Sequence, residues 1–314
     1  MRSARFLALA LAVIAPIAGC LRLYDSSPDG DASVDAPNPD ADSDLSAFDC
    51  AVDLPCGTPT PGQASVCGTI YDIETEAPIR APNPTRQACT AITPDGPCSL
   101  RIRYFDALDF AMNPQGAVPL VADSAMLDDC GRFRALDLPR ATFGFIGIAV
   151  DDAAGTDVRH RLTSVAVSNA EAGGDAAAPQ RAYATAITTD ELWGTSAGLS
   201  GMTFAERGVM VVVFLHAGQP VSGVAVRRND LGIPADDLYF SDPGITRRVV
   251  APAQTSTGTN GTALVVNSAT PIAHDGVGGA PAGCVWPSRL GSSIPGTVFM
   301  QRKEAETPSG APCP

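Results

Sequence analysis

The chain has 314 residues, of which 45% are hydrophobic and 18% are charged, and its formal net charge is −13. This balance excludes a coiled coil, a polytopic membrane protein and a mostly disordered chain. The acidic charge gives no general attraction to a phosphate backbone, which disfavours a nucleic-acid partner.

The first 20 residues have the layout of an export signal. Arg2 and Arg5 precede an apolar stretch, 6–17, that is too short to cross about 30 Å of hydrocarbon. Two small residues then lead to Cys20, an arrangement that resembles the lipobox of bacterial lipoproteins. The resemblance implies a lipoprotein signal peptide at 1–20, cleaved before Cys20, and acylation of Cys20 of the palmitate type. A plain signal peptide with a chance cysteine is the alternative reading.

Several acyl chains hold a protein durably on a bilayer, so the expected partner at this end is the membrane. Residue 21 is Leu. In enterobacteria an Asp at this place signals inner-membrane retention, so we expect an outer-membrane lipoprotein whose body is periplasmic or surface-facing.

Residues 21–49 are expected to form a disordered acidic linker. They hold eight Asp and a single Arg, together with many Pro, Ser and Ala residues. Such a segment buries too little apolar surface to offset the entropy of ordering it, and its like charges extend it. The Asp pattern at 40–44 lacks the Gly and Glu that an EF-type calcium loop needs, so no metal site is expected.

The rest of the chain is expected to be mainly β. Short segments alternate apolar and polar residues between Pro and Gly positions, the period of half-buried strands. We expect two tandem β-sandwich domains of prealbumin or immunoglobulin type, at 50–158 and 206–314, joined by a connecting segment, 159–205, with one short helix. Strands are predicted at 100–104, 131–136, 143–150, 162–167, 182–187, 209–215, 221–226, 238–240, 262–266 and 297–300.

A family resemblance supports this fold class. The segments VCGTIYD at 66–72, ETEAP at 74–78 and DCGRF at 129–133 resemble a carboxypeptidase regulatory-like domain of transthyretin type, with Glu76 in place of the family's turn Gly. Residues 211–224 and 257–261 resemble a second, more diverged copy. The resemblance implies non-catalytic β-sandwich modules and supplies no catalytic residues.

The best helical window is 188–199. Thr188 and Glu191 match a capping box at its start. Ser196 lies in a G-x-S-x-G pattern that resembles the patatin-like or esterase-like nucleophile elbow, with Asp275 as its acidic partner. An elbow needs its helix after the serine, and here the helix precedes it, so we expect a helix end at Ser196 and no catalytic residues.

Eight cysteines follow Cys20, and an even number in an exported chain predicts four disulfides. Cys89 and Cys98 flank a Pro-Asp-Gly turn, so they are expected to pair. Cys284 and Cys313 are the last two cysteines and are expected to pair with each other. The pairing of the other four, Cys50, Cys56, Cys67 and Cys130, stays open. No CxxC motif exists, which argues against a metal site.

Other polar and aromatic residues give weaker signals. The three histidines, His160, His216 and His274, form no metal-binding motif and are expected to be ordinary loop or turn residues. Trp193 and Trp286 are expected in the core, although an exposed Trp would offer a stacking platform for a sugar.

Two patterns in the second expected domain concern turns and strand faces. Asn260-Gly261 predicts a two-residue hairpin turn. The pairs Arg227-Arg228 and Arg247-Arg248 are expected on solvated strand faces, and contact with acidic groups is the alternative.

Together these features predict a non-enzymatic, membrane-anchored exported lipoprotein with a structural or binding role in the cell envelope. No cofactor or metal is expected, and an envelope protein or a polysaccharide is the expected partner class. The alternatives are a serine hydrolase that uses Ser196 and a carbohydrate-binding surface protein.

Overall fold

The computed structural model describes residues 50, 52, 54–90, 92–93, 96–121, 126–169, 172, 178–199, 201–242, 244, 246–268 and 270–314. The expected signal peptide 1–20, its lipidation residue Cys20 and the expected linker 21–49 lie outside these described residues. Within the described ranges, no helix combines the length and the apolar composition needed to cross a bilayer.

The body is mainly β, as predicted. Its strands are β1 Gln63–Asp72, β2 Leu100–Asp106, β3 Met126–Leu127, β4 Arg132–Pro139, β5 Phe145–Asp152, β6 His160–Ser168, β7 Gln180–Ala186, β8 Val209–His216, β9 Gln219–Pro220, β10 Ala225–Arg228, β11 Leu231–Gly232, β12 Leu238–Phe240, β13 Thr262–Val266, β14 Ile272–Val277, β15 Arg289–Gly291 and β16 Thr297–Glu304. The α-helices are α1 Ala107–Met112, α2 Ile187–Ser196 and α3 Phe204–Arg207.

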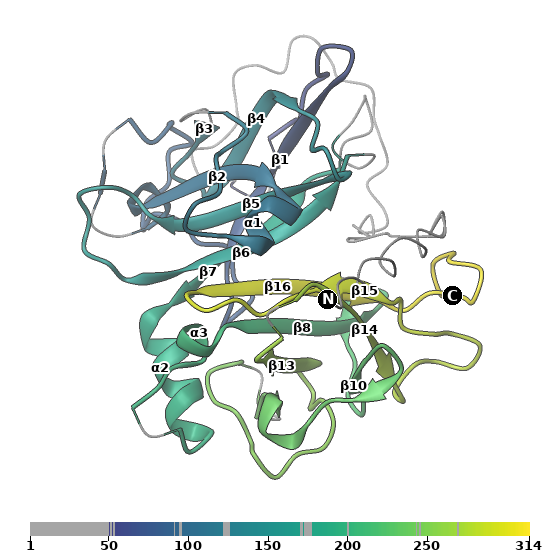
Figure 1. Cartoon of the computed structure of the whole chain (residues 1–314). Coiled ribbons are helices and arrows are strands. Elements are labelled where there is room, and N and C mark those ends of the chain that lie inside the picture. The colour runs from purple at the N-terminus through teal and green to yellow at the C-terminus, as the bar shows by residue number, and fades with distance from the viewer. Residues whose placement is uncertain are drawn as a thin grey trace, which may run out of the picture.

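Most strands belong to one branched sheet. Its main path runs β12-β13-β8-β16-β6-β7-β1-β4-β3, with the β2–β5 pair attached to β6, and a four-stranded sheet, β11-β10-β14-β15, lies apart from it. The strands up to β7 form the upper half of the molecule and the strands from β8 onward form the lower half (Figure 1). The halves meet where β16 pairs in parallel with β6.

The expected connecting segment 159–205 contains more than its helix. It also holds β6 and β7, and β6 pairs with both β5 and β16 while β7 pairs with β1. The largest hydrophobic cluster is shared by the two halves, because it joins Phe133 and Ile148 to Val211 and Leu264. The two halves therefore share a core, and the division at 50–158 and 206–314 stays a prediction.

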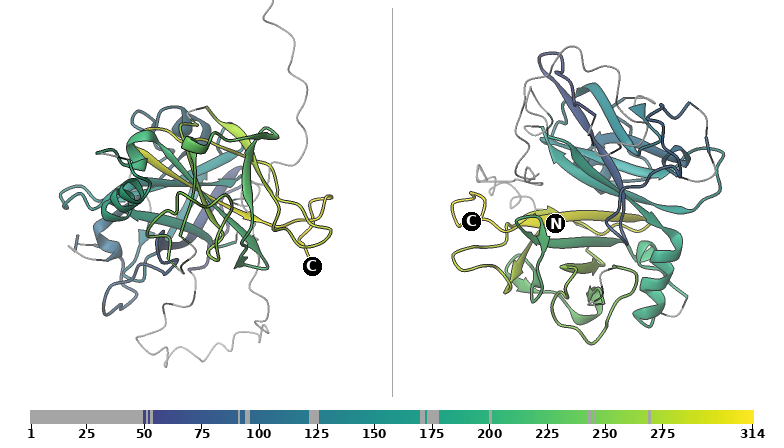
Figure 2. Two further views of the ribbon diagram at one scale, coloured as in Figure 1. Left: turned by 90° about the horizontal axis from the view of Figure 1, so that it is seen from below. Right: turned by 180° about the vertical axis from the view of Figure 1, so that it is seen from behind.

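The helix in this segment forms as expected, but its cap differs. α2 follows Ala186, which makes no side-chain capping bond, so the predicted capping box at Thr188 is wrong. A capping box does form one helix later, where Thr203 Oγ1 accepts from Glu206 N and the Glu206 side chain accepts from Thr203 N. The two helices lie together at one end of the lower half, as two further views show (Figure 2).

The Asn260-Gly261 turn is not a two-residue hairpin. β13 pairs with β8 and with β12, and 21 residues, 241–261, separate β12 from β13. The buried Asn260 side chain instead holds that long connection, because its Nδ2 lies 2.8 Å from Asp242 O and 3.0 Å from Gly244 O. Gly261 has φ 65°, and a Cβ there would lie 2.6 Å from Phe214 O, so both the conformation and the space require glycine.

All eight cysteines of the described body are paired. The bonds join Cys89 to Cys98 and Cys284 to Cys313, the two pairs expected from the sequence. They also join Cys50 to Cys130 and Cys56 to Cys67. Three bonds therefore tie the upper half together, and one closes the C-terminal segment onto the lower half.

Candidate functional site

Ser196 is the last residue of α2, and its hydroxyl bonds only to backbone groups within the described chain. Its Oγ lies 2.6 Å from Leu192 O, which accepts the hydroxyl proton, and it accepts from Val250 N at 2.9 Å. A nucleophile elbow places the serine between a strand and the start of a helix, with a base within reach of the hydroxyl. Ser196 instead fastens a helix end to a neighbouring loop.

Asp275 and the histidines lie in other environments. Asp275 sits in β14 and forms an ion pair with Arg227 of β10, with Nη2 2.5 Å from Oδ2. His160 Nδ1 lies 2.6 Å from Asp152 Oδ1, and His216 Nε2 lies 3.0 Å from Pro314 O. The structure therefore does not bring Ser196 and Asp275 together. Arg227, expected on a solvated face, has a side chain that is 37% exposed and that also pairs with a carboxylate.

The part of the chain that the structure describes contains no group of three or more His, Cys, Asp or Glu side chains arranged to hold a metal ion. Both tryptophans are buried, at 0% exposure for Trp193 and 5% for Trp286. Neither side chain can therefore serve as an exposed stacking platform for a sugar.

A network of charged side chains joins the two halves. Glu76 follows β1 and adopts φ 57°, the left-handed conformation that favours glycine. Its carboxylate lies 2.9 Å from Arg247 Nη1 and 3.3 Å from Arg181 Nη1, and Tyr183 donates to it at 3.4 Å. These charge-assisted contacts explain why a residue with a side chain is tolerated there.

Arg247 was expected on a solvated face and is instead buried between the halves. Its Nε donates to Thr262 Oγ1 at 2.6 Å and its Nη1 donates to Ile73 O at 3.0 Å. Its own carbonyl accepts from Trp193 Nε1 at 2.5 Å. The Arg247 side chain thus connects the turn after β1 to strand β13, and its backbone carbonyl adds helix α2.

Two bases are buried in the lower half. Lys303, the single lysine of the chain, is fully buried in β16, and its Nζ donates to His274 O and Pro287 O at 2.8 and 3.1 Å. Burial holds the pKa of Lys303 well below its usual value. Burial, reinforced by Lys303, lowers the pKa of His274 to about 4. Both side chains are buried away from solvent, so their protonation affects the free energy of unfolding.

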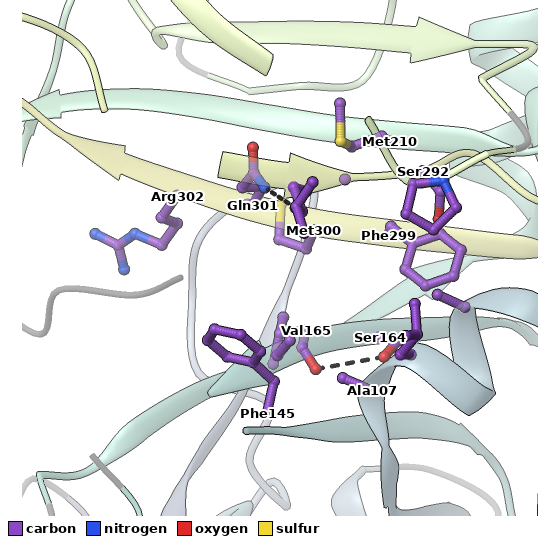
Figure 3. A pocket seen from close by; sticks show the side chains of 16 residues that line it. Ala107, Phe145, Ser164, Val165, Met210, Ser292, Phe299, Met300, Gln301 and Arg302 are labelled. Carbon is purple, nitrogen blue, oxygen red and sulfur yellow. Dashed lines mark hydrogen bonds between the residues drawn. The ribbon is translucent and has the colours of Figure 1, made fainter. Parts of the chain in front are cut away.

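A cavity lies where the two halves separate. β16 pairs with β6 only from Thr297 to Phe299, after which β16 continues beside β8 and β6 continues beside β5. The cavity has a volume of about 110 Å³. Figure 3 shows Arg302 and Phe145 at one end and Phe299, Ser292 and Ala107 at the other.

The lining of the cavity is mostly apolar. Met210, Met300, Phe145 and Phe299 contribute large soft surfaces. The cavity exists because several lining residues have small side chains or none, namely Ala107, Ala111, Ala166 and Gly291. The polar side chains of the lining are Ser164, Ser292, Gln301 and Arg302.

No pattern in the sequence predicts this cavity. α1, which forms one wall, is only six residues long, and its signal is Asp106, whose Oδ1 accepts from Leu108 N at the helix start. The local sequence gives one hint. In β16 the residues 299, 301 and 303 share one face, and the two polar members, Gln301 and Lys303, are buried, which is unusual for a strand face inside a protein. The separation of β6 from β16 depends on pairing between residues more than 130 positions apart, which no local pattern reveals.

No family model matches the chain, and no curated protein matches it. Among solved structures, the shaft pilin spaA from Lactobacillus rhamnosus GG is similar at 10% identity, with 78% of this chain and 98% of that chain covered and a TM-score of 0.21. The major pilin protein T-13 from Streptococcus pyogenes serotype GAS131465 is similar at 7% identity, with 80% and 100% covered and a TM-score of 0.18. Overlap this poor transfers neither fold nor function, so the β class rests on the strands themselves.

Proposed function

We propose that the chain is an exported lipoprotein, held in the outer membrane through acyl groups on Cys20, whose cross-linked β body has a non-enzymatic structural or binding role in the cell envelope. The acidic segment 21–49 acts as a tether between the anchor and the body. An envelope protein or a polysaccharide is the proposed partner.

The pairing of the cysteines carries this proposal. The eight cysteines of the described body bond to one another, so the ninth cysteine of the sequence, Cys20, is not needed for any of these four disulfides. Disulfides form and persist in oxidising compartments, so four of them support export. A remaining cysteine directly after an apolar signal is what the lipid anchor requires.

Two observations favour a non-enzymatic body over a serine hydrolase. The Ser196 hydroxyl is engaged by the carbonyl of its own helix and by Val250 N. Asp275 is held by Arg227 in the separate four-stranded sheet. Activation of a serine requires a base in hydrogen-bond contact, and Ser196 has backbone partners in its place.

Metabolic labelling tests the anchor. Cells fed an alkyne-tagged palmitate should incorporate the tag into the wild-type chain, and a Cys20→Ala variant should carry none. In the same cells a serine-directed fluorophosphonate probe should leave the protein unlabelled. Tagging of the Cys20→Ala variant would refute the anchor, and probe labelling that disappears in Ser196→Ala would establish the hydrolase.

Amine labelling gives an independent test of processing. Lys303 is the single lysine and is fully buried, so in the folded protein the α-amine is the one amine that a reagent can reach. If that amine is acylated on Cys20, the folded protein takes up no label, and reduction with denaturation exposes Lys303 alone. One label on the folded protein would contradict acylation of the amine.

A further inference from the structure

The cavity between β6 and β16 has the size of a single ring. Its volume is about 110 Å³. An apolar protein cavity of about 150 Å³ holds one benzene molecule, whereas sites for drug-sized ligands span roughly 300–1,000 Å³. An oligosaccharide or a folded partner segment therefore does not fit, but one small apolar group does.

The walls suit a flat or slender apolar group. Thioethers of Met210 and Met300 lie in the lining, and sulfur–aromatic contacts are favourable. Phe299 already belongs to an aromatic cluster, with its ring 6.0 Å from that of Phe110 in an edge-on arrangement. A bound ring beside Phe299 would extend this cluster, and aromatic pairs of this geometry add stability beyond the area they bury.

One end of the cavity is cationic. Arg302 is half-buried at this end, its guanidinium extends outward from the other lining side chains, and its Nη1 lies 3.5 Å from Tyr183 Oη (Figure 3). A planar guanidinium matches a carboxylate in geometry and charge, and a partly dehydrated site strengthens that pairing. The other polar side chains of the lining are neutral, so the site has one charged end and an otherwise apolar interior.

We propose that this cavity binds a small apolar monocarboxylate, with its ring or short chain between β6 and β16 and its carboxylate on Arg302. This assignment rests on the binding role proposed above and names the class of ligand. Anchoring at Cys20 does not depend on it, because the ligand site lies wholly within the described body. If the cavity binds no ligand, the proposal of a lipid anchor at Cys20 is unaffected. If Cys20 carries no lipid, the proposal of a ligand site in the cavity is unaffected.

Calorimetric titration of the full chain in lipid nanodiscs tests the proposal, with empty nanodiscs as the blank. The probes are benzoate and octanoate, each compared with its neutral amide, benzamide and octanamide. We expect saturable binding of at least one carboxylate with a Kd on the order of 0.1–1 mM. Its amide should bind at least about 10-fold more weakly, as expected for the loss of a charge-assisted hydrogen bond. The carboxylate that binds more tightly shows whether the apolar part of the natural ligand is an aromatic ring or an aliphatic chain.

Two variants assign the binding to this cavity. Arg302→Met should lower affinity for the preferred carboxylate at least about 10-fold, to the level of the amide, whereas Arg134→Met, at another half-buried arginine, should leave it unchanged. Ala111→Leu, in the wall that α1 forms, should abolish binding of both probes, and Ala197→Leu, at the residue that follows α2, is its control outside the cavity.

Three results would overturn the proposal. One is the absence of saturable binding by either carboxylate at 10-fold above the expected range. Another is equal affinity for acid and amide together with no effect of Arg302→Met. The third is binding that survives Ala111→Leu in a variant whose folding is verified by its near-UV circular dichroism.

Discussion

The buried arginine that joins the two halves gives the sharpest stability prediction. Arg247→Met keeps the apolar length of the side chain but removes its contacts with Glu76, Thr262 and Ile73. Removing one partner of a buried ion pair typically costs about 3–5 kcal/mol. Glu76 keeps Arg181 at 3.3 Å and its side chain is 24% exposed, so we expect a smaller loss, about 2–3 kcal/mol.

Guanidinium chloride unfolding of the oxidised protein measures this loss, and thermal unfolding should show a Tm lower by roughly 5–10 °C. Arg248→Met is the matched control. Arg248 is the next residue, its side chain is 63% exposed, and its Nε lies 3.9 Å from Glu74 Oε1. A loss for Arg247→Met within about 0.5 kcal/mol of this control would refute the bridging role.

Glu76→Gly separates backbone strain from the ion pairs at the same network. Glycine relieves the positive φ, which by itself would stabilise the fold by about 1 kcal/mol. The variant also deprives Arg247 of its carboxylate. We expect the ion pairs to dominate and the variant to unfold more easily than the wild type, and a more stable Glu76→Gly protein would contradict this balance.

Three further predictions concern single sites. His274 has a folded pKa of about 4 against 6.5 unfolded, so between these values the unfolded chain binds the extra proton and stability falls as pH falls. Urea unfolding from pH 7.5 to 5 should show a loss of stability that is larger by about 2 kcal/mol in the wild type than in His274→Leu. Asn260→Ala should cost about 2 kcal/mol in the same assay, because it leaves the carbonyls of the 241–246 loop without their donor. Replacing Cys50 and Cys130 by Ser should cost about 4.5 kcal/mol and replacing Cys284 and Cys313 about 3.6 kcal/mol, because the loops span 80 and 29 residues. Equal losses would contradict the chain-entropy origin.

Local patterns predicted many of the strands but not how they assemble. The segments 238–240 and 262–266 form strands with the expected bounds, because their apolar runs are delimited by turn residues. β14 was missed, since its sequence IAHDGV carries His274 and Asp275 in place of an apolar alternation. Those two residues are explained by long-range partners, Lys303 and Arg227, that the local sequence does not identify.

For the candidate site residues too, local features were predicted and long-range ones were not. Ser196 was correctly expected at a helix end, because the helix precedes the serine, whereas an elbow needs its helix after the serine. Arg247 was misplaced on a solvated face, because its burial is created by Glu76 and Thr262, both distant in sequence. The cavity arises from the separation of β6 and β16, and its Arg302 is an ordinary strand residue until that topology is known.

Counting thiols in the protein taken from the membrane fraction tests the central claim most directly. The account predicts no maleimide-reactive thiol in the denatured, unreduced chain and eight after reduction, because four disulfides hold eight cysteines and a thioether to lipid holds the ninth. One reactive thiol before reduction would contradict acylation of Cys20, and nine would contradict export of the chain altogether.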